Sequence, residues 1–168
     1  MSIIPDVVAF QKSLAALPIS TYEAGEIVLA AGSTTEKLLV LRQGVVEVLR
    51  EGTQIAKVSE PGAVFGELSA LLGTPHTADV RALERSEFSV AGAASLLAGD
   101  AAATLYIAAI LARRLDGANA ALVEVKRQLE AGKPRSAISK MVDKVQEFLS
   151  SGSGTAGLPY EAFLMHPY

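Results

Sequence analysis

The stretch FGELSALLGTPHTADV, residues 65–80, lies near the middle of the chain and carries its most informative pattern. An extended run ends at Phe65, Gly66 and Glu67 open a short apolar turn of helix, and Gly-Thr-Pro breaks it. His76 follows, directly before a segment that alternates like a strand. Glycine lets backbone come close to a ligand, and the free N–H groups of a first helical turn attract anions. The pattern predicts a loop that holds a small anionic ligand.

The residues on both sides of this stretch, from 21 to 89, form short β-rich runs separated by turns. Several short strands with closely spaced turn signals indicate an all-β sandwich or roll. We therefore expect a mainly β fold with flanking helices, an antiparallel, jelly-roll-like β-roll. The runs are EIVLAA (26–31), KLLVLRQ (37–43), VVEVLR (45–50), QIAKVS (54–59), TADVRAL (77–83) and SEFSVAG (86–92), and GVVEVLREGTQIAKVSE (44–60) is the clearest hairpin.

Two helices are predicted to flank the β-rich region. Apolar residues at spacings of three and four indicate an amphipathic helix over residues 3–17, which Pro18 ends. Asp100 is a suitable N-cap for a long helix from Ala101 to about Ala131.

The long helix carries an apolar stripe with a strict 3-4 repeat. Three heptads of this kind are enough to predict a coiled-coil contact with a second copy of the chain. The alternative is a helix packed only on its own β domain, but Ile107, Ile110 and Ala121 lie off the stripe and provide a second face for that packing. The stripe consists of Ala108, Leu111, Leu115, Ala118, Leu122, Val125 and Leu129.

The last part of the chain, residues 133–168, is predicted to lie outside the main domain of residues 1–132. Gly132, Lys133 and Pro134 break the long helix, and a shorter amphipathic helix capped by Ser136 follows. SSGSGTAG has the composition of a flexible linker. The final GLPYEAFLMHPY either docks on the domain or is a disordered end.

Composition excludes several classes of function. The net charge of −3 and the absence of a Lys/Arg block argue against nucleic-acid and membrane-surface binding. No Cys is present, and the two histidines, His76 and His166, are far apart, so neither a thiolate nor a cupin-like metal site is expected. Ser69 near His76 lacks a nucleophile-elbow context. No signal peptide or membrane span is recognised, so we expect a cytoplasmic, non-enzymatic protein without metal or cofactor.

The chemistry of residues 66–67 narrows the class of ligand that the loop could bind. The Glu67 carboxylate would repel a bare phosphate, so it suits a ligand that also offers a hydroxyl donor, such as a ribose beside a phosphate. A first-turn carboxylate that only stabilises its helix N-terminus is the alternative.

The motif FGEL (65–68), followed by G-T-P-x-T-A-x-V-x-A (73–82), resembles the phosphate-binding cassette of cyclic nucleotide-binding domains. These domains occur in the catabolite activator protein, protein kinase A regulatory subunits and nucleotide-gated channels. The resemblance extends from about residue 21 through the long helix and includes the Ala-Arg-Arg-Leu run at 112–115. It implies a β-roll that holds cyclic AMP or cyclic GMP and signals to a separate partner protein.

The resemblance also implies roles for individual residues. Glu67 would accept from the ribose 2′-OH, and Thr77 would offer its hydroxyl to the phosphate or a purine edge. The backbone at Gly66, Leu68 and Ala78 would border the sugar and phosphate. The long helix would cap the base and form a dimer, with Arg114 and Asn119 as its polar candidates for base contact. A DNA-binding domain is not expected, because only 33 residues follow position 135.

His76 departs from the family pattern, which has an arginine that grips the cyclic phosphate. Losing one charge-assisted hydrogen bond costs about 1.5–3 kcal/mol, roughly ten- to a hundred-fold in affinity. Three interpretations remain open. His76 still contacts phosphate in a weak binder that binds more tightly at acidic pH; the site has lost nucleotide binding and the domain is a dimeric adaptor or scaffold; or a different ligand is bound.

Overall fold

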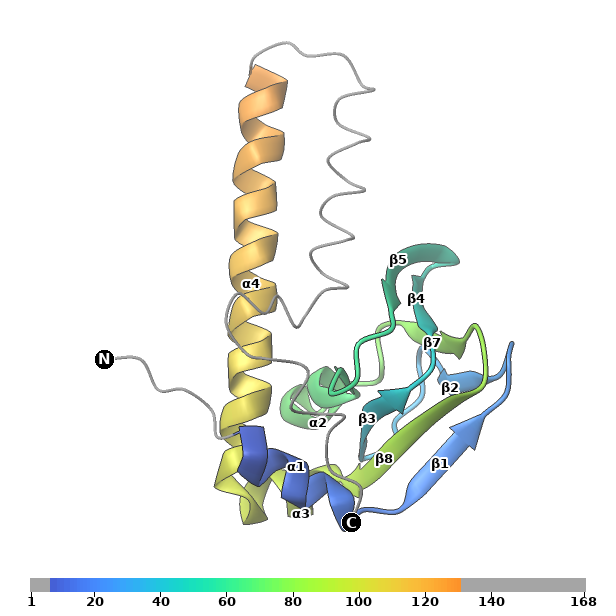
Figure 1. The fold of residues 1–168 in the computed structure, drawn as a ribbon. Helices are drawn as coiled ribbons and strands as arrows, with labels where there is room; N and C mark the ends of the chain where they lie inside the picture. Colours follow the sequence, from blue (N-terminus) through green and yellow to red (C-terminus); the bar gives the residue numbers. More distant parts are fainter. Residues whose placement is uncertain (1–6, 131–168) are drawn as a thin grey trace.

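The computed structural model describes residues 7–130. Its β domain consists of two antiparallel four-stranded sheets that face each other (Figure 1). One sheet has the order β1-β8-β3-β6 and the other the order β2-β7-β4-β5. The strands are β1 (Ile19–Tyr22), β2 (Ile27–Leu29), β3 (Lys37–Gln43), β4 (Val46–Arg50), β5 (Thr53–Val58), β6 (Val64–Phe65), β7 (Asp79–Ala82) and β8 (Ser86–Gly92).

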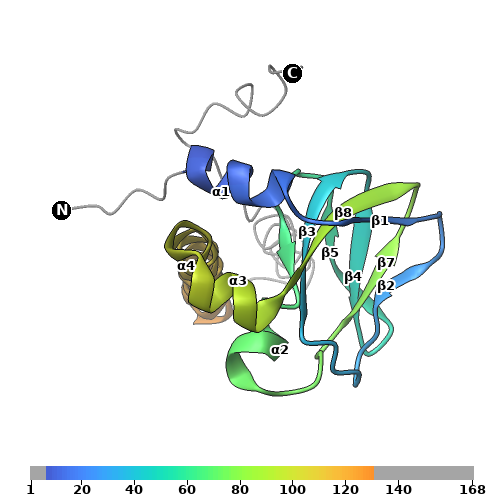
Figure 2. The ribbon, with the colours of Figure 1, turned by 90° about the horizontal axis from the view of Figure 1, so that it is seen from below.

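The helices lie to one side of this β-roll (Figure 2). They are α1 (Val7–Ala15), α2 (Glu67–Leu72), α3 (Ala93–Gly99) and α4 (Ala101–Glu130). α4 is much longer than the roll is deep and extends away from it (Figure 1). Only its first half packs on the domain, where Ile107 and Ile110 are buried.

Strand β3 shows why one sheet is covered on both faces. Leu39 and Leu41 point into the roll, where they meet the aromatic ring of Phe88 and other apolar residues of the inner core. Leu38 and Val40 point the other way, into a second core shared with the helices. The run KLLVLRQ therefore shows no polar alternation, because both faces of a strand in this position exclude water.

The second core fastens the helices to the roll. Phe10 of α1 stacks on Tyr106 of α4 with ring centroids 4.1 Å apart, and Ile107 is 1% exposed. Stacked aromatic pairs add to the free energy gained from burying apolar area. This core therefore holds α1 and the first half of α4 as one layer on the sheet.

Asp100 marks the bend between α3 and α4, whose axes meet at 105°. Its Oδ1 accepts a hydrogen bond of 2.9 Å from the Ala103 N–H, as an N-cap does, and its Oδ2 accepts from the Ser13 hydroxyl of α1. Within residues 7–130 no single helix is long and apolar enough to cross a membrane; α3 and α4 meet that test only as this bent pair.

The predicted β-roll, its central hairpin and the Asp100-capped helix are confirmed, and β3 and β8 begin and end where the sequence pattern places them. Strand β1 and helix α3 are not among the expected elements. The amphipathic helix is described only from Val7 onwards. The Ser136-capped helix, the linker, the tail and His166 lie outside the described residues.

Candidate functional site

The cassette turns sharply at Gly66, between β6 and α2. Gly66 has φ of +89°, and a Cβ at this position would lie 2.5 Å from the carbonyl oxygen of Lys37. Only glycine fits such a backbone without strain. Gly66 also provides no side-chain cap for α2. The sequence thus places a bare backbone turn beside β3, as the glycine at this position predicted.

Glu67 is held by an arginine from the long helix. Its side chain is buried, and its Oε1 accepts a 2.5 Å hydrogen bond from Nη1 of Arg114. Nη2 of Arg114 lies 3.3 Å from the Val64 carbonyl oxygen, to which it donates. Arg114 therefore bridges the cassette and α4. It lies beside the carboxylate that the family resemblance assigns to the ribose.

This pair is charged and mostly shielded from water. The Glu67 side chain is 7% exposed and that of Arg114 24%, and Nε of Arg114 is buried without a hydrogen-bond partner among the described residues. A carboxylate can accept about four hydrogen bonds, so the contact with Arg114 leaves Glu67 able to receive a ligand hydroxyl.

His76 is buried rather than extended into open space. Its Nε2 lies 3.0 Å from the Thr35 hydroxyl oxygen, and its Cε1 lies 3.6 Å from where a Cβ on Gly66 would be. Backbone hydrogen bonds of 2.8 Å connect it to Gly32 and Ser33. His76 thus ties the loop between β2 and β3 to the cassette, and its ring lies against the glycine turn.

Thr35 is the site residue that sequence reasoning missed. Nothing in a single sequence connects residues 35 and 76, which lie 41 positions apart. Thr35 also borders a cavity of about 320 Å³ between the two sheets. The Tyr22 side chain borders the same cavity, and burial raises the pKa of that phenol, with a smaller contribution from Glu26.

The other predicted site residues are more exposed to solvent than Glu67 and His76. Leu68 is 47% exposed on α2, Thr77 is exposed and Ala78 is half-buried. Asn119 is exposed on α4. The structure places Gly66, Glu67 and His76 close to one another, and their roles in binding stay a prediction. It places Arg114, proposed as a base contact, on the Glu67 carboxylate.

The apolar stripe of α4 is largely open. Leu115, Leu122 and Leu129 are 63%, 68% and 60% exposed, whereas Ile107 and Ile110, which lie off the stripe, are buried in the core. Exposed leucines at intervals of seven on one face are typical of a helix that meets another helix. Leu111 of the stripe, by contrast, is partly buried against that core. The core-facing side of α4 is therefore confirmed at Ile107 and Ile110, and the partner of the stripe stays a prediction.

No cluster of three His, Asp or Glu side chains that could hold a metal ion occurs within residues 7–130. The acidic groups nearest the cassette are already engaged: Glu67 with Arg114, and Asp79 with the Ala31 N–H at 2.7 Å. What the arrangement offers is a backbone turn, one buried carboxylate with its arginine and one buried imidazole.

Comparison with known proteins finds a family match over the β-roll. Residues 19–101 match the family described as the cyclic nucleotide-binding domain. The chain is 41% identical over 107 residues to Glutaminase 2 of Bradyrhizobium diazoefficiens, a match that covers 59% of this chain and 17% of the glutaminase. It therefore spans less than a fifth of that relative.

Two solved structures share the fold. The catabolite activator protein of Thermus thermophilus superposes with a TM-score of 0.61 at 20% sequence identity. The match covers 88% of this chain and 81% of the chain of that protein. The N-terminal domain of a transcriptional regulator from Streptomyces coelicolor A3(2) superposes with a TM-score of 0.52 at 24% sequence identity. That match covers 68% of this chain and 86% of the regulator domain. At these identities the likeness concerns the fold, a β-roll followed by a long helix.

Proposed function

Because residues 19–101 belong to the cyclic nucleotide-binding domain family, in the form found in the catabolite activator protein, we propose that this chain is a non-enzymatic regulatory module for cyclic AMP or cyclic GMP. The ligand binds at the cassette, against Gly66, Glu67, Leu68, His76, Thr77 and Ala78. The observation that carries the proposal is the buried Glu67–Arg114 pair, since it links this cassette directly to the long helix.

The mechanism follows from what the pair connects. A ribose hydroxyl that donates to Glu67 competes with Arg114 for the carboxylate and alters their ion pair. Because Arg114 is part of α4, the change reaches the long helix. A ligand shifts a conformational equilibrium only by its different affinity for the two states. Here the two states are α4 with Arg114 seated on Glu67 and α4 with Arg114 released or reoriented.

His76 makes the phosphate contact weaker than an arginine would. Its Nε2 is occupied by Thr35, so one ring nitrogen at most remains for the phosphate. Backbone donors of the turn provide the rest of the contact. We expect weak binding, and we expect His76→Arg to tighten it about ten- to a hundred-fold.

The output is a contact with other proteins. The exposed Leu115, Leu122 and Leu129 support a homodimer through the long helix, residues 101–131. A change in α4 then reaches both the dimer and a separate downstream partner. We place the module in the cytoplasm and expect it to bind neither DNA nor membrane, since its sequence has a net charge of −3 and no Lys/Arg block.

A second function is favoured by one specific observation. Glu67 is already paired with Arg114, and His76 already contacts Thr35, so each of these two buried side chains has a protein partner without a ligand. The same fold would then serve as a ligand-free dimeric adaptor.

Calorimetric titration of cyclic AMP and cyclic GMP into the full chain separates the two functions. The regulatory proposal expects binding to the wild type, tighter binding to His76→Arg and weaker binding to Glu67→Gln. Heat only with His76→Arg would mean a degenerate site and favour the adaptor. No heat with either protein would reject nucleotide regulation altogether.

A further inference from the structure

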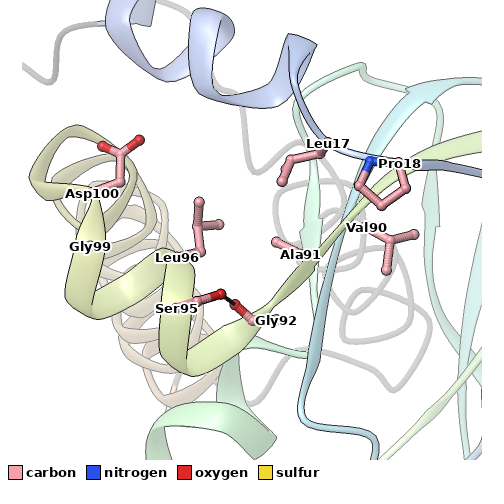
Figure 3. A pocket seen from close by; sticks show the side chains of 9 residues that line it. All are labelled: Leu17, Pro18, Val90, Ala91, Gly92, Ser95, Leu96, Gly99 and Asp100. Carbon is pink, nitrogen blue, oxygen red and sulfur yellow. Dashed lines mark hydrogen bonds between the residues drawn. The ribbon is translucent and has the colours of Figure 1, made fainter.

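A cavity of about 440 Å³ lies away from the cassette, where the end of α1, strand β8 and helix α3 meet (Figure 3). Its size is within the range of small-molecule sites. It has no residue in common with the proposed nucleotide site. We refer to it as the α1–α3 cavity.

The walls of this cavity are apolar. Leu17 and Pro18 border it from the α1–β1 connection, and Val90 and Ala91 from β8, with Leu96 opposite them on α3 (Figure 3). Ala91 and Leu96 are buried in the helical core. The cavity is therefore a concave apolar surface on a rigid base, which suits the body of a small organic molecule.

The two polar side chains that line it, Ser95 and Asp100, present hydrogen-bond acceptors to a ligand. The Ser95 hydroxyl donates to the Gly92 carbonyl oxygen at 2.9 Å, so its own oxygen is left as an acceptor. Asp100 lies at the other end (Figure 3). Hydrogen bonds from Ser13 and then Ala103 hold the pKa of its carboxyl below the usual value, so it is ionised near neutral pH. Among residues 7–130, no Lys, Arg or His lines the cavity.

We propose that the α1–α3 cavity binds a small organic amine, with the apolar part against Leu17, Ala91 and Leu96 and the ammonium group near the Asp100 carboxylate. An apolar wall whose polar side chains present acceptors favours a cation over a neutral molecule, and it disfavours an anion such as a cyclic nucleotide. This inference does not depend on the proposed function of the cassette.

A ligand in this cavity would affect the bend between α3 and α4. Asp100 caps α4 and contacts α1 through Ser13, and it stands at the 105° bend from which α4 begins. An amine seated between α1, β8 and α3 fixes the elements that set this bend. It therefore stabilises one direction of α4, the helix that also carries the apolar stripe.

Substitution of Gly99 can test whether the cavity binds a ligand. Gly99 lines the cavity, and a Cβ added to it would meet no atom within 4 Å. A side chain at Gly99 is thus tolerated at its Cβ, so Gly99→Leu places a bulky group at the edge of the cavity to obstruct it, and Gly99→Ala is the matched control that adds only a methyl group. Asp100→Asn removes the charge but keeps a residue that caps helices well.

The test uses the full ¹⁵N-labelled chain with three probes of similar size: 2-phenylethylamine, 2-phenylethanol and phenylacetate. We expect the amine to shift the amide signals of residues 90–100 but not those of residues 66–78. It should bind about two- to fivefold more tightly than the alcohol, as for a partly exposed ion pair, and phenylacetate should bind least. Gly99→Leu should abolish these shifts, and Gly99→Ala should keep them.

Several results would overturn the proposal: no shift with any probe, amine binding that survives in folded Gly99→Leu, or phenylacetate binding as well as the amine. Asp100→Asn provides an independent check should Gly99→Leu not fold. There the amine and the alcohol should bind equally, and a preserved preference for the amine would remove Asp100 from the site.

Discussion

Replacing Arg114 by methionine is the sharpest perturbation of the contact between the cassette and α4. Methionine keeps most of the apolar stem and removes the guanidinium, which leaves the buried Glu67 carboxylate, 7% exposed, without its ion pair. Removing one partner of a fully buried pair costs about 3–5 kcal/mol. Because the Arg114 side chain is 24% exposed, we expect the lower range for a charged hydrogen bond, about 1.5–3 kcal/mol.

Urea unfolding of the full chain measures this loss, and thermal unfolding should show a melting temperature lower by about 3–12 °C. Arg113→Met, the neighbouring arginine on α4, is the matched control and should stay within about 0.5 kcal/mol of wild type. In the double variant Glu67→Gln with Arg114→Met no unpaired charge remains, so part of the stability should return. A coupling free energy below about 0.5 kcal/mol would refute the claim that this pair joins the cassette to α4.

Three further predictions concern the frame around the site. Gly66→Ala should destabilise the domain by at least about 1–2 kcal/mol in urea unfolding, since alanine is strained at φ of +89° and its Cβ would lie 2.5 Å from the Lys37 carbonyl oxygen; wild-type stability would contradict the turn geometry. Leu115→Asp should sediment as a monomer with an unchanged β-domain melting temperature, because Leu115 is 63% exposed; an unchanged dimer would place the interface elsewhere. Asp100→Ala should lose about 1 kcal/mol through its N-cap. Since the folded pKa of Asp100 lies below its ordinary value of 3.8, its contribution is present above that value and lost as the pH falls through the folded pKa, so the stability gap between wild type and Asp100→Ala should narrow in acid; a gap that stays constant as the pH falls would be inconsistent.

The sequence was most informative where local chemistry decides the structure. The hairpin of β4 and β5, the N-cap at Asp100 and the glycine turn at Gly66 each depend on residues close together in the chain, and each is confirmed. The exposed stripe of α4 was also predictable, because a helical repeat assigns residues to faces without any knowledge of the partner.

The elements that the sequence did not predict depend on distant pairing. Strand β1 is a four-residue edge strand that pairs with β8, more than sixty positions further along the chain. Helix α3 begins at Ala93, and its N-cap residue Gly92 has no capping side chain. The helix lies within an apolar run, so no local signal separates it from the strand before it.

The same reason limited the prediction of the site. Glu67 and His76 were identified from a local motif, but their partners lie 47 and 41 positions away. Arg114 was recognised as a polar residue of the long helix, and only the packing of α4 on the sheet shows that it contacts Glu67. Tertiary contacts of this kind need the fold before the residues can be paired.

Amide hydrogen exchange of the full chain with saturating cyclic AMP or cyclic GMP tests the coupling between cassette and long helix most directly. The account predicts that nucleotide changes the protection of the cassette around residues 66–78 and also of α4 around residues 111–118. In Arg114→Met the cassette should still respond, whereas α4 should not. A nucleotide response in the cassette with unchanged exchange in wild-type α4, or the same α4 response in both proteins, would contradict it.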